Sequence, residues 1–163
     1  MAIVPIADVY NVVLGVHVVG VVLAFGWTFA LPIMYAVASR HAPRGLALLH
    51  RIEYTSTRVL LNPALLLVLG AGIYLAGDGH HWSEFFVQWG LGAIVVIGAI
   101  AGSVMIPTAK RAELAALGDL EAAGGGDPVA SPAYLALVRR LNLFGGAMWV
   151  LVIATILIMA AKP

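Results

Sequence analysis

His17 is the residue with the clearest capacity for chemistry in this sequence. It lies within a long apolar run near the N-terminus, and it is the one ionisable side chain placed well inside such a run. A titratable group in hydrocarbon is costly, so we expect His17 to face the interior of a helix bundle. Neutral imidazole is a ligand for haem iron, copper or zinc, and it also relays protons. The alternative is a structural histidine that only hydrogen-bonds to a neighbouring helix.

A second pair of candidate ligands, His80 and His81, lies in a short segment that also contains Asp78 and Glu84. Two imidazoles and two carboxylates could bind copper or zinc, whereas the alternative is a solvated loop at the membrane surface. A metal site that joins His17 to His81 requires this loop to fold back into the bundle. The sequence therefore offers His17, His80 and His81 as candidate metal ligands, and His17 as a candidate cofactor ligand.

The remaining histidines, His41 and His50, lie among arginines, where contact with phosphate or lipid headgroups accounts for them. No two ionisable groups can be placed within reach of each other at membrane depth, so no acid–base couple can be named. The sequence therefore argues against an enzyme without excluding one. The absence of cysteine excludes disulfides, thiolate zinc sites and cysteine-ligated iron–sulfur clusters.

Composition identifies the kind of protein that must position these histidines. Of 163 residues, 62% are hydrophobic and only 10% are charged, whereas soluble domains have about 45–50% apolar and about 25% charged residues. A soluble domain of this size could not bury so much apolar surface, and a disordered chain would need higher charge. The chain is therefore expected to be a multi-pass membrane protein. Nucleic acid is not an expected partner, because no basic cluster extends beyond Arg139-Arg140.

Four apolar runs predict four membrane-spanning helices, in a single all-α domain that covers residues 1–163. They comprise residues 9–38, 59–76, 85–106 and 143–161, and each is long enough to cross about 30 Å of hydrocarbon. The first is too long, and lacks the preceding cations, for a cleavable signal peptide. The expected architecture is an antiparallel four-helix bundle.

The distribution of cations predicts how the bundle is oriented. Eight of the nine Lys and Arg residues lie between the first and second spans or between the third and fourth, and only Lys162 lies elsewhere. Because cytoplasmic loops are enriched in Lys and Arg, both termini and the short loop 77–84 are expected outside. The expected location is the bacterial inner membrane.

The two longer loops carry signals for further helix. Residues 46–54 show apolar residues at helical spacing, and residues 109–123 are rich in Ala, Leu and Glu, so the third helix is expected to continue beyond the membrane. Pro107 predicts an end or a kink of the third span. The Gly124–Pro128 stretch should then break the chain, and Ser131-Pro132 is typical of a helix start.

Several short motifs carry a resemblance over nearly the whole chain. They are His17 followed by Gly20, the stretch Leu69–Leu75, Trp89 at the start of the third span, Tyr134-Leu-x-Leu-x-Arg-Arg, and the closing Met-x-x-Lys-Pro. With these the chain resembles a family of small bacterial predicted integral membrane proteins with four helices and uncharacterised function. More distantly, the first helix is similar to that of copper-resistance D proteins and of the membrane-bound HemJ-type protoporphyrinogen oxidase.

The distant resemblance implies a role in copper or haem handling for His17 alone. The oxidase pattern also has a lysine in the third span, which residues 85–106 lack, so b-type haem or metal binding, with a redox role, is the remaining implication. No second histidine lies within the other spans, so the site would be five-coordinate or would use His80 or His81. The alternatives are a small oligomeric channel or transporter, and an accessory subunit of a membrane complex.

Overall fold

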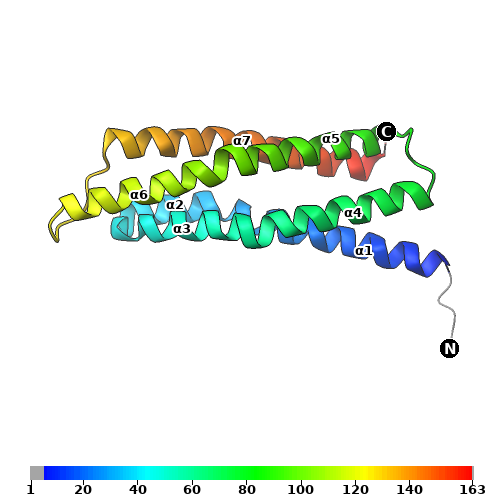
Figure 1. Ribbon diagram of the computed structural model, residues 1–163, viewed down its shortest axis with the longest axis horizontal. Helices are drawn as coiled ribbons and strands as arrows, with labels where there is room; N and C mark the ends of the chain where they lie inside the picture. The colour runs from blue at the N-terminus through cyan, green and yellow to red at the C-terminus, as the bar shows by residue number, and fades with distance from the viewer. Residues whose placement is uncertain (1–5, 163) are drawn as a thin grey trace, which may run out of the picture.

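The protein folds into four long helical segments, described for residues 6–162 by a computed structural model (Figure 1). Within the described residues there is no strand, which confirms the all-α class. The first segment consists of α1 (Ile6–Phe25), the 3-10 turn η1 (Gly26–Phe29) and α2 (Leu31–His41), and the second of the short turn η2 (Pro43–Gly45), α3 (Leu46–Ser56), the π-helical turn η3 (Thr57–Leu61) and α4 (Asn62–Asp78). The third consists of α5 (Phe85–Ile100), the π-helical turn η4 (Ala101–Met105) and α6 (Ile106–Ala122). The fourth is a single helix, α7 (Pro132–Ala161).

Each segment contains a stretch that is long and apolar enough to span a membrane, as predicted. The helical segments are longer than the predicted spans: they run over Val9–His41, Pro43–Asp78, Phe85–Ala122 and Pro132–Ala161. At 1.5 Å per residue, such segments measure roughly 45–57 Å, well beyond a hydrocarbon core of about 30 Å. A substantial part of each therefore extends past the membrane.

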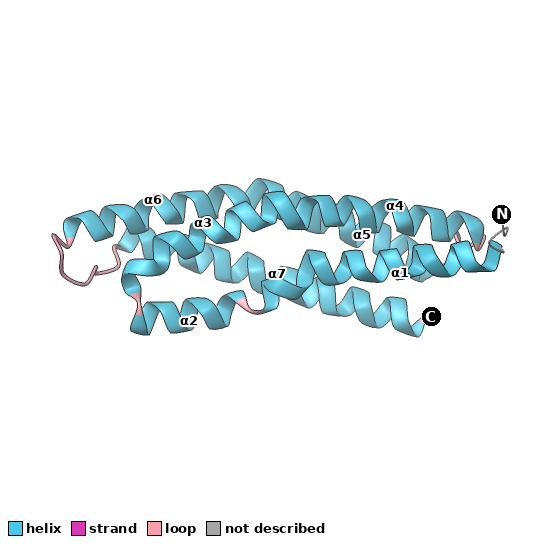
Figure 2. Ribbon diagram, turned by 90° about the horizontal axis from the view of Figure 1, so that it is seen from below, coloured by secondary structure: helices cyan, strands magenta, loops and turns pink. Residues whose placement is uncertain are grey.

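The segments are antiparallel, so α1 begins and α7 ends at the same end of the bundle, here called the terminal end (Figure 1). The turn between α6 and α7 lies at the opposite end, here called the far end. Near the terminal end α1 packs along α4 and α5 packs along α7, while at the far end α3 packs along α6 (Figure 2). Which side of the membrane the terminal end faces stays a prediction from the cations.

The connections form where the sequence signals predicted them. Helix α6 continues to Ala122, and the chain then turns at Gly124 and Gly125, whose φ angles of 54° and 102° are left-handed. Glycine adopts such angles more readily than other residues, which favours the break at this point. Helix α7 then begins at Pro132, and the Ser131 hydroxyl caps it by accepting a hydrogen bond from the Tyr134 amide at 3.2 Å.

Three of the four segments contain an irregular turn directly before a proline. The turns η1, η3 and η4 precede Pro32, Pro63 and Pro107, each the second residue of the helix that follows. Proline lacks an amide hydrogen and collides with the carbonyl four residues earlier, and a wider or tighter turn relieves both problems. Pro107 therefore does not end the third helix, because the π-helical turn before it lets the helix continue.

A hydroxyl group accompanies each of these irregular turns. Thr28 donates to the carbonyl of Phe25 at 2.7 Å, Thr57 to that of Glu53 at 2.8 Å, and Ser103 to that of Ala99 at 2.6 Å. Hydroxyls that bond back to the preceding turn loosen and bend a helix. Each of the three turns thus contains a hydroxyl residue and is followed within a few positions by a proline.

Close helix packing depends on one of the glycines that the sequence offers. An ideal Cβ on Gly20 would lie 2.7 Å from Leu67 Cδ2 and 2.8 Å from Val68 Cγ2, so α1 and α4 approach closely there. Gly98 and Gly102 are four residues apart, a spacing typical of closely packed membrane helices, but a Cβ on either would meet nothing within 4 Å in the part of the chain that the structure describes. Their spacing is not used inside this bundle.

The interior consists of two clusters of buried apolar side chains, and Met105 packs against both. One lies in the membrane-spanning part and includes Phe25, Leu61, Leu65, Ile97 and Met148. The other lies at the far end and is built mainly from alanines and Tyr134: Ala47, Ala109, Ala112, Ala116, Tyr134 and Leu141. Large apolar side chains such as Val59, Leu66, Val95 and Val150 are exposed on the outside, as expected for a surface that contacts lipid.

Candidate functional site

His17 lies on α1, and its ring is directed at α4 instead of at the lipid-facing surface. Its Nδ1 atom is 3.0 Å from the carbonyl oxygen of Val68. A carbonyl only accepts, so Nδ1 must carry the hydrogen, and in the neutral ring the opposite nitrogen, Nε2, has a free lone pair. The close approach at Gly20, one turn further along α1, brings Val68 within reach of this ring.

A second glycine makes room for the His17 ring. An ideal Cβ on Gly72 would lie 3.4 Å from His17 Cε1 and 3.6 Å from Nδ1, so the ring rests against the bare backbone of α4. An alanine Cβ at residue 72 would stand in ordinary van der Waals contact with the ring, whereas a longer side chain directed the same way would displace it. The two motifs noted in the sequence, His17 with Gly20 and the stretch 69–75, therefore meet at one place.

His17 lines a cavity of about 550 Å³ between α1, α4, α5 and α7, here called the His17 cavity. Its walls are mostly apolar side chains of these four helices, and the few polar groups among the lining residues include Tyr10, His81, Thr155 and Lys162. Small-molecule and cofactor sites occupy roughly 300–1,000 Å³ and combine apolar walls with a few polar groups. The cavity has the size and chemistry of such a site.

The structure separates the two loop histidines. His81 lines the His17 cavity and its ring packs against Phe86 with centroids 6.0 Å apart, because the loop folds back and the His81 amide bonds to the Ala76 carbonyl at 2.9 Å. His80 is exposed and does not belong to the cavity wall. Of the three predicted metal ligands, His17 and His81 thus share one cavity, whereas His80 lies apart.

Bare metal ions usually need three or more donor side chains from the protein. Among the side chains that the structure describes, those of residues 9–162, no group of three or more His, Cys, Asp or Glu has the geometry to hold a metal ion. A haem needs less from the protein, because the porphyrin supplies four ligands and one or two side chains complete the coordination. The His17 cavity offers one such side chain, with a second imidazole, that of His81, on its wall.

Sequence reasoning missed a buried polar cluster where α2, α3 and α7 meet. The sequence predicts contact with phosphate or lipid headgroups for His50, but His50 is only 1% exposed and Glu53, one turn later on α3, is 5% exposed. His50 Nδ1 lies 3.5 Å from Glu53 Oε2, so two ionisable groups do come together just before the predicted second span. The arginines nearby in sequence point elsewhere, because the helix turns His50 towards the interior.

Hydrogen bonds in this cluster form a directed chain. The Tyr35 hydroxyl donates to Glu53 Oε2 at 2.5 Å and lies 2.7 Å from His50 Nδ1, which must therefore donate to it. On the other side of the ring, His50 Nε2 lies 3.1 Å from the Tyr134 hydroxyl. The chain runs from Tyr134 through His50 and Tyr35, and it ends on the carboxylate of Glu53.

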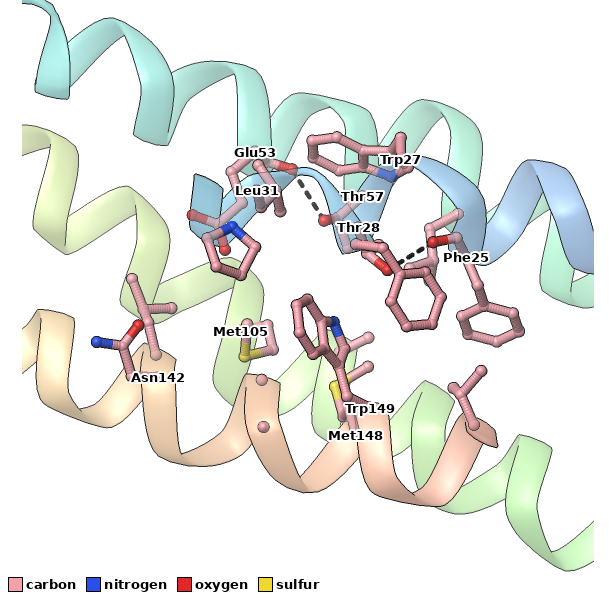
Figure 3. A pocket seen from close by; sticks show the side chains of 18 of the residues that line it. Phe25, Trp27, Thr28, Leu31, Glu53, Thr57, Met105, Asn142, Met148 and Trp149 are labelled. Carbon is pink, nitrogen blue, oxygen red and sulfur yellow. Dashed lines mark hydrogen bonds between the residues drawn. The ribbon is translucent and has the colours of Figure 1, made fainter. Parts of the chain in front are cut away.

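Glu53 also borders a second cavity of about 290 Å³, here called the Glu53 cavity (Figure 3). The three irregular turns contribute to its wall through Thr28, Thr57 and Ala101, and α7 contributes Gly145 and Trp149. Irregular backbone at membrane depth is tolerated where it lines a cavity, and π-helical turns are frequent at functional sites.

Comparison with known proteins adds no identification. No protein-family model, curated protein or solved structure matches the chain. The resemblances noted in the sequence therefore stay expectations.

Proposed function

We propose that this protein is a membrane protein that binds b-type haem in the His17 cavity, with His17 as an axial ligand. The observation that carries the proposal is the hydrogen bond from His17 Nδ1 to the Val68 carbonyl. Metal-ligating histidines almost always donate their other ring hydrogen to a carbonyl or carboxylate, which fixes the tautomer and raises the basicity of the ligating nitrogen. With Nδ1 bonded to this carbonyl, Nε2 of His17 is the nitrogen that would bind a metal.

The surroundings of His17 suit a flat apolar cofactor. The cavity has about 550 Å³ and mostly apolar walls, and Gly72 leaves the backbone of α4 bare beside the ring. Lys162, on the cavity wall at the terminal end, is a cation that could pair with a carboxylate of the cofactor. When bound, haem would supply one-electron or ligand-binding chemistry, and the protein would supply the axial ligand and exclude water.

A copper ion held by His17 and His81 is the alternative occupant of the same cavity, because both imidazoles lie on its wall. For the cell location we propose the inner membrane with both termini outside, on the grounds of the cation distribution. We also propose lipid as its surroundings, and a homo-oligomer or a larger membrane complex as its assembly.

The test is an absorption spectrum of the detergent-purified protein, as isolated, after addition of haem, and after reduction with dithionite. We expect a Soret band that shifts on reduction and is lost in His17→Ala. His41→Ala is the matched control, because His41 is exposed at the end of α2, and it should keep the band. A spectrum that stays featureless after haem is added, or a band that survives in His17→Ala, would overturn the proposal.

The same preparations distinguish copper from haem. Metal analysis after incubation with copper should show no His17-dependent copper if haem is the occupant. His81→Ala then reports on the second axial position: a changed Soret maximum indicates that His81 is a ligand, and an unchanged one indicates that His17 acts alone.

A further inference from the structure

The Glu53 cavity contains a carboxylate among aromatic side chains, and this combination is specific in its chemistry. Phe25, Trp27, Phe29 and Trp149 line the cavity, and Phe29 and Trp149 pack together with ring centroids 5.1 Å apart. Figure 3 shows Trp27 and Trp149 on opposite sides of this cavity, with Phe25 and Glu53 towards its two ends. Aromatic faces attract cations, and a buried carboxylate needs a positive partner or strong donors.

The charge of the Glu53 cavity is one-sided. Among the described residues that line this cavity, Glu53 is the one acidic side chain, and none is Lys or Arg. His50, which lies 3.5 Å from Glu53 and bonds to Tyr35 and Tyr134, does not line the cavity. The cavity is therefore set up to attract a positive ligand.

Trp27 adds an independent sign of a ligand. Its indole Nε1 is buried and has no hydrogen-bond partner within the described residues, although Trp27 lines this cavity. Buried donors are nearly always satisfied, and an exception calls for an explanation. An acceptor atom on a bound molecule would satisfy this donor.

We propose that the Glu53 cavity binds a small organic cation with apolar substituents, such as a quaternary ammonium or an amine. The carboxylate of Glu53 neutralises its charge, and the rings of Trp27, Phe29 and Trp149 surround its apolar groups. An oxygen atom on the ligand would accept from Trp27 Nε1. This site is separate from the His17 cavity and does not depend on haem binding.

The probe for this site is benzyltrimethylammonium, measured by isothermal titration calorimetry on the purified full-length protein at neutral pH. Its uncharged carbon isostere, neopentylbenzene, is the ligand control. We expect the cation to bind and the isostere to bind at least about tenfold more weakly, because it cannot use the carboxylate or the cation–π contacts. Equal binding of both ligands, or no binding of the cation at millimolar concentrations, would overturn the proposal.

Variants locate the binding to this cavity. Glu53→Gln keeps an oxygen that accepts from Tyr35 and should weaken cation binding at least about tenfold. Glu113→Gln is the matched control, since Glu113 pairs with Arg51 at 4.0 Å and does not line the cavity, and it should bind like the unaltered protein. If Glu53→Gln does not fold, Trp149→Leu tests the aromatic wall and should also weaken binding. Unchanged affinity in a folded cavity variant would refute the assignment.

Discussion

The contact at Gly20 allows the packing of α1 on α4 to be tested quantitatively. In Gly20→Ala, the new Cβ would lie 2.7 Å from Leu67 Cδ2 and 2.8 Å from Val68 Cγ2, whereas carbon atoms normally lie about 3.5–4.0 Å apart. Leu67 can rotate away, but a valine in a helix is held in one favoured rotamer. The two helices must therefore separate, and overpacking of this kind costs about 1–3 kcal/mol.

Gly15→Ala is the matched control, because Gly15 is exposed on the same helix and its Cβ would meet nothing within 4 Å. Both variants gain about the same helix propensity from alanine, so that contribution cancels in the comparison. For a chain of this size 1 kcal/mol corresponds to about 2–4 °C, so Gly20→Ala should melt roughly 2–12 °C below Gly15→Ala.

The assay is thermal unfolding in detergent, followed by the amount of monodisperse protein that remains after heating. The order of the two variants is the informative result, because the choice of detergent shifts both melting temperatures together. Equal melting temperatures, or a higher value for Gly20→Ala, would show that α1 and α4 do not approach closely at this point. The positioning of His17 against Val68 would then lose its structural basis.

Three further outcomes follow from other contacts. Ser131→Ala should lower stability by about 0.5–2 kcal/mol through loss of the cap on α7, and Ser131→Asp should restore it; equal thermal unfolding of both variants would contradict the cap. Thr155→Val should cost about 0.5–1.5 kcal/mol because Trp89 Nε1 loses its acceptor at 3.1 Å, and Thr155→Ser should recover the loss. Since the chain has no cysteine, single cysteines at Ser83 and Val129 can be labelled in intact cells with an impermeant maleimide. Ser83→Cys should react at once and Val129→Cys only after lysis, and the reverse pattern would invert the topology.

Much of the fold could be predicted from the sequence, because the constraints on it are local. Four apolar runs, the glycines at 124–126 and the Ser131-Pro132 start are each contained within a few residues, and each appears in the structure as expected. The irregular turns were less visible. Proline signals a disturbance, but whether the helix ends or widens is decided by the helices packed around it, which a local pattern does not contain.

The two candidate sites also differ in how clearly the sequence indicates them. His17 stood out because a polar residue in an apolar run is conspicuous, and its environment near Val68 and Gly72 depends on a partner helix about fifty residues away. Glu53 and His50 were overlooked because they lie in a mixed polar stretch. A signal was present: Ala47, His50, Glu53 and Thr57 recur at helical spacing and form the buried face of this segment.

Because the helical segments are longer than the hydrocarbon core is thick, one part of the bundle is surrounded by lipid and the other by water. Near the terminal end the outer surface contacts lipid, where packing and hydrogen bonds stabilise the bundle without help from water. At the far end the alanine-rich cluster of α3, α6 and α7 lies among charged residues such as Arg51, Lys110 and Arg139, where the hydrophobic effect in water operates. Urea acts in water, so it should destabilise the far end of each continuous helical segment and leave the part within the bilayer folded. Unfolding of this protein should begin at the far end and advance towards the membrane.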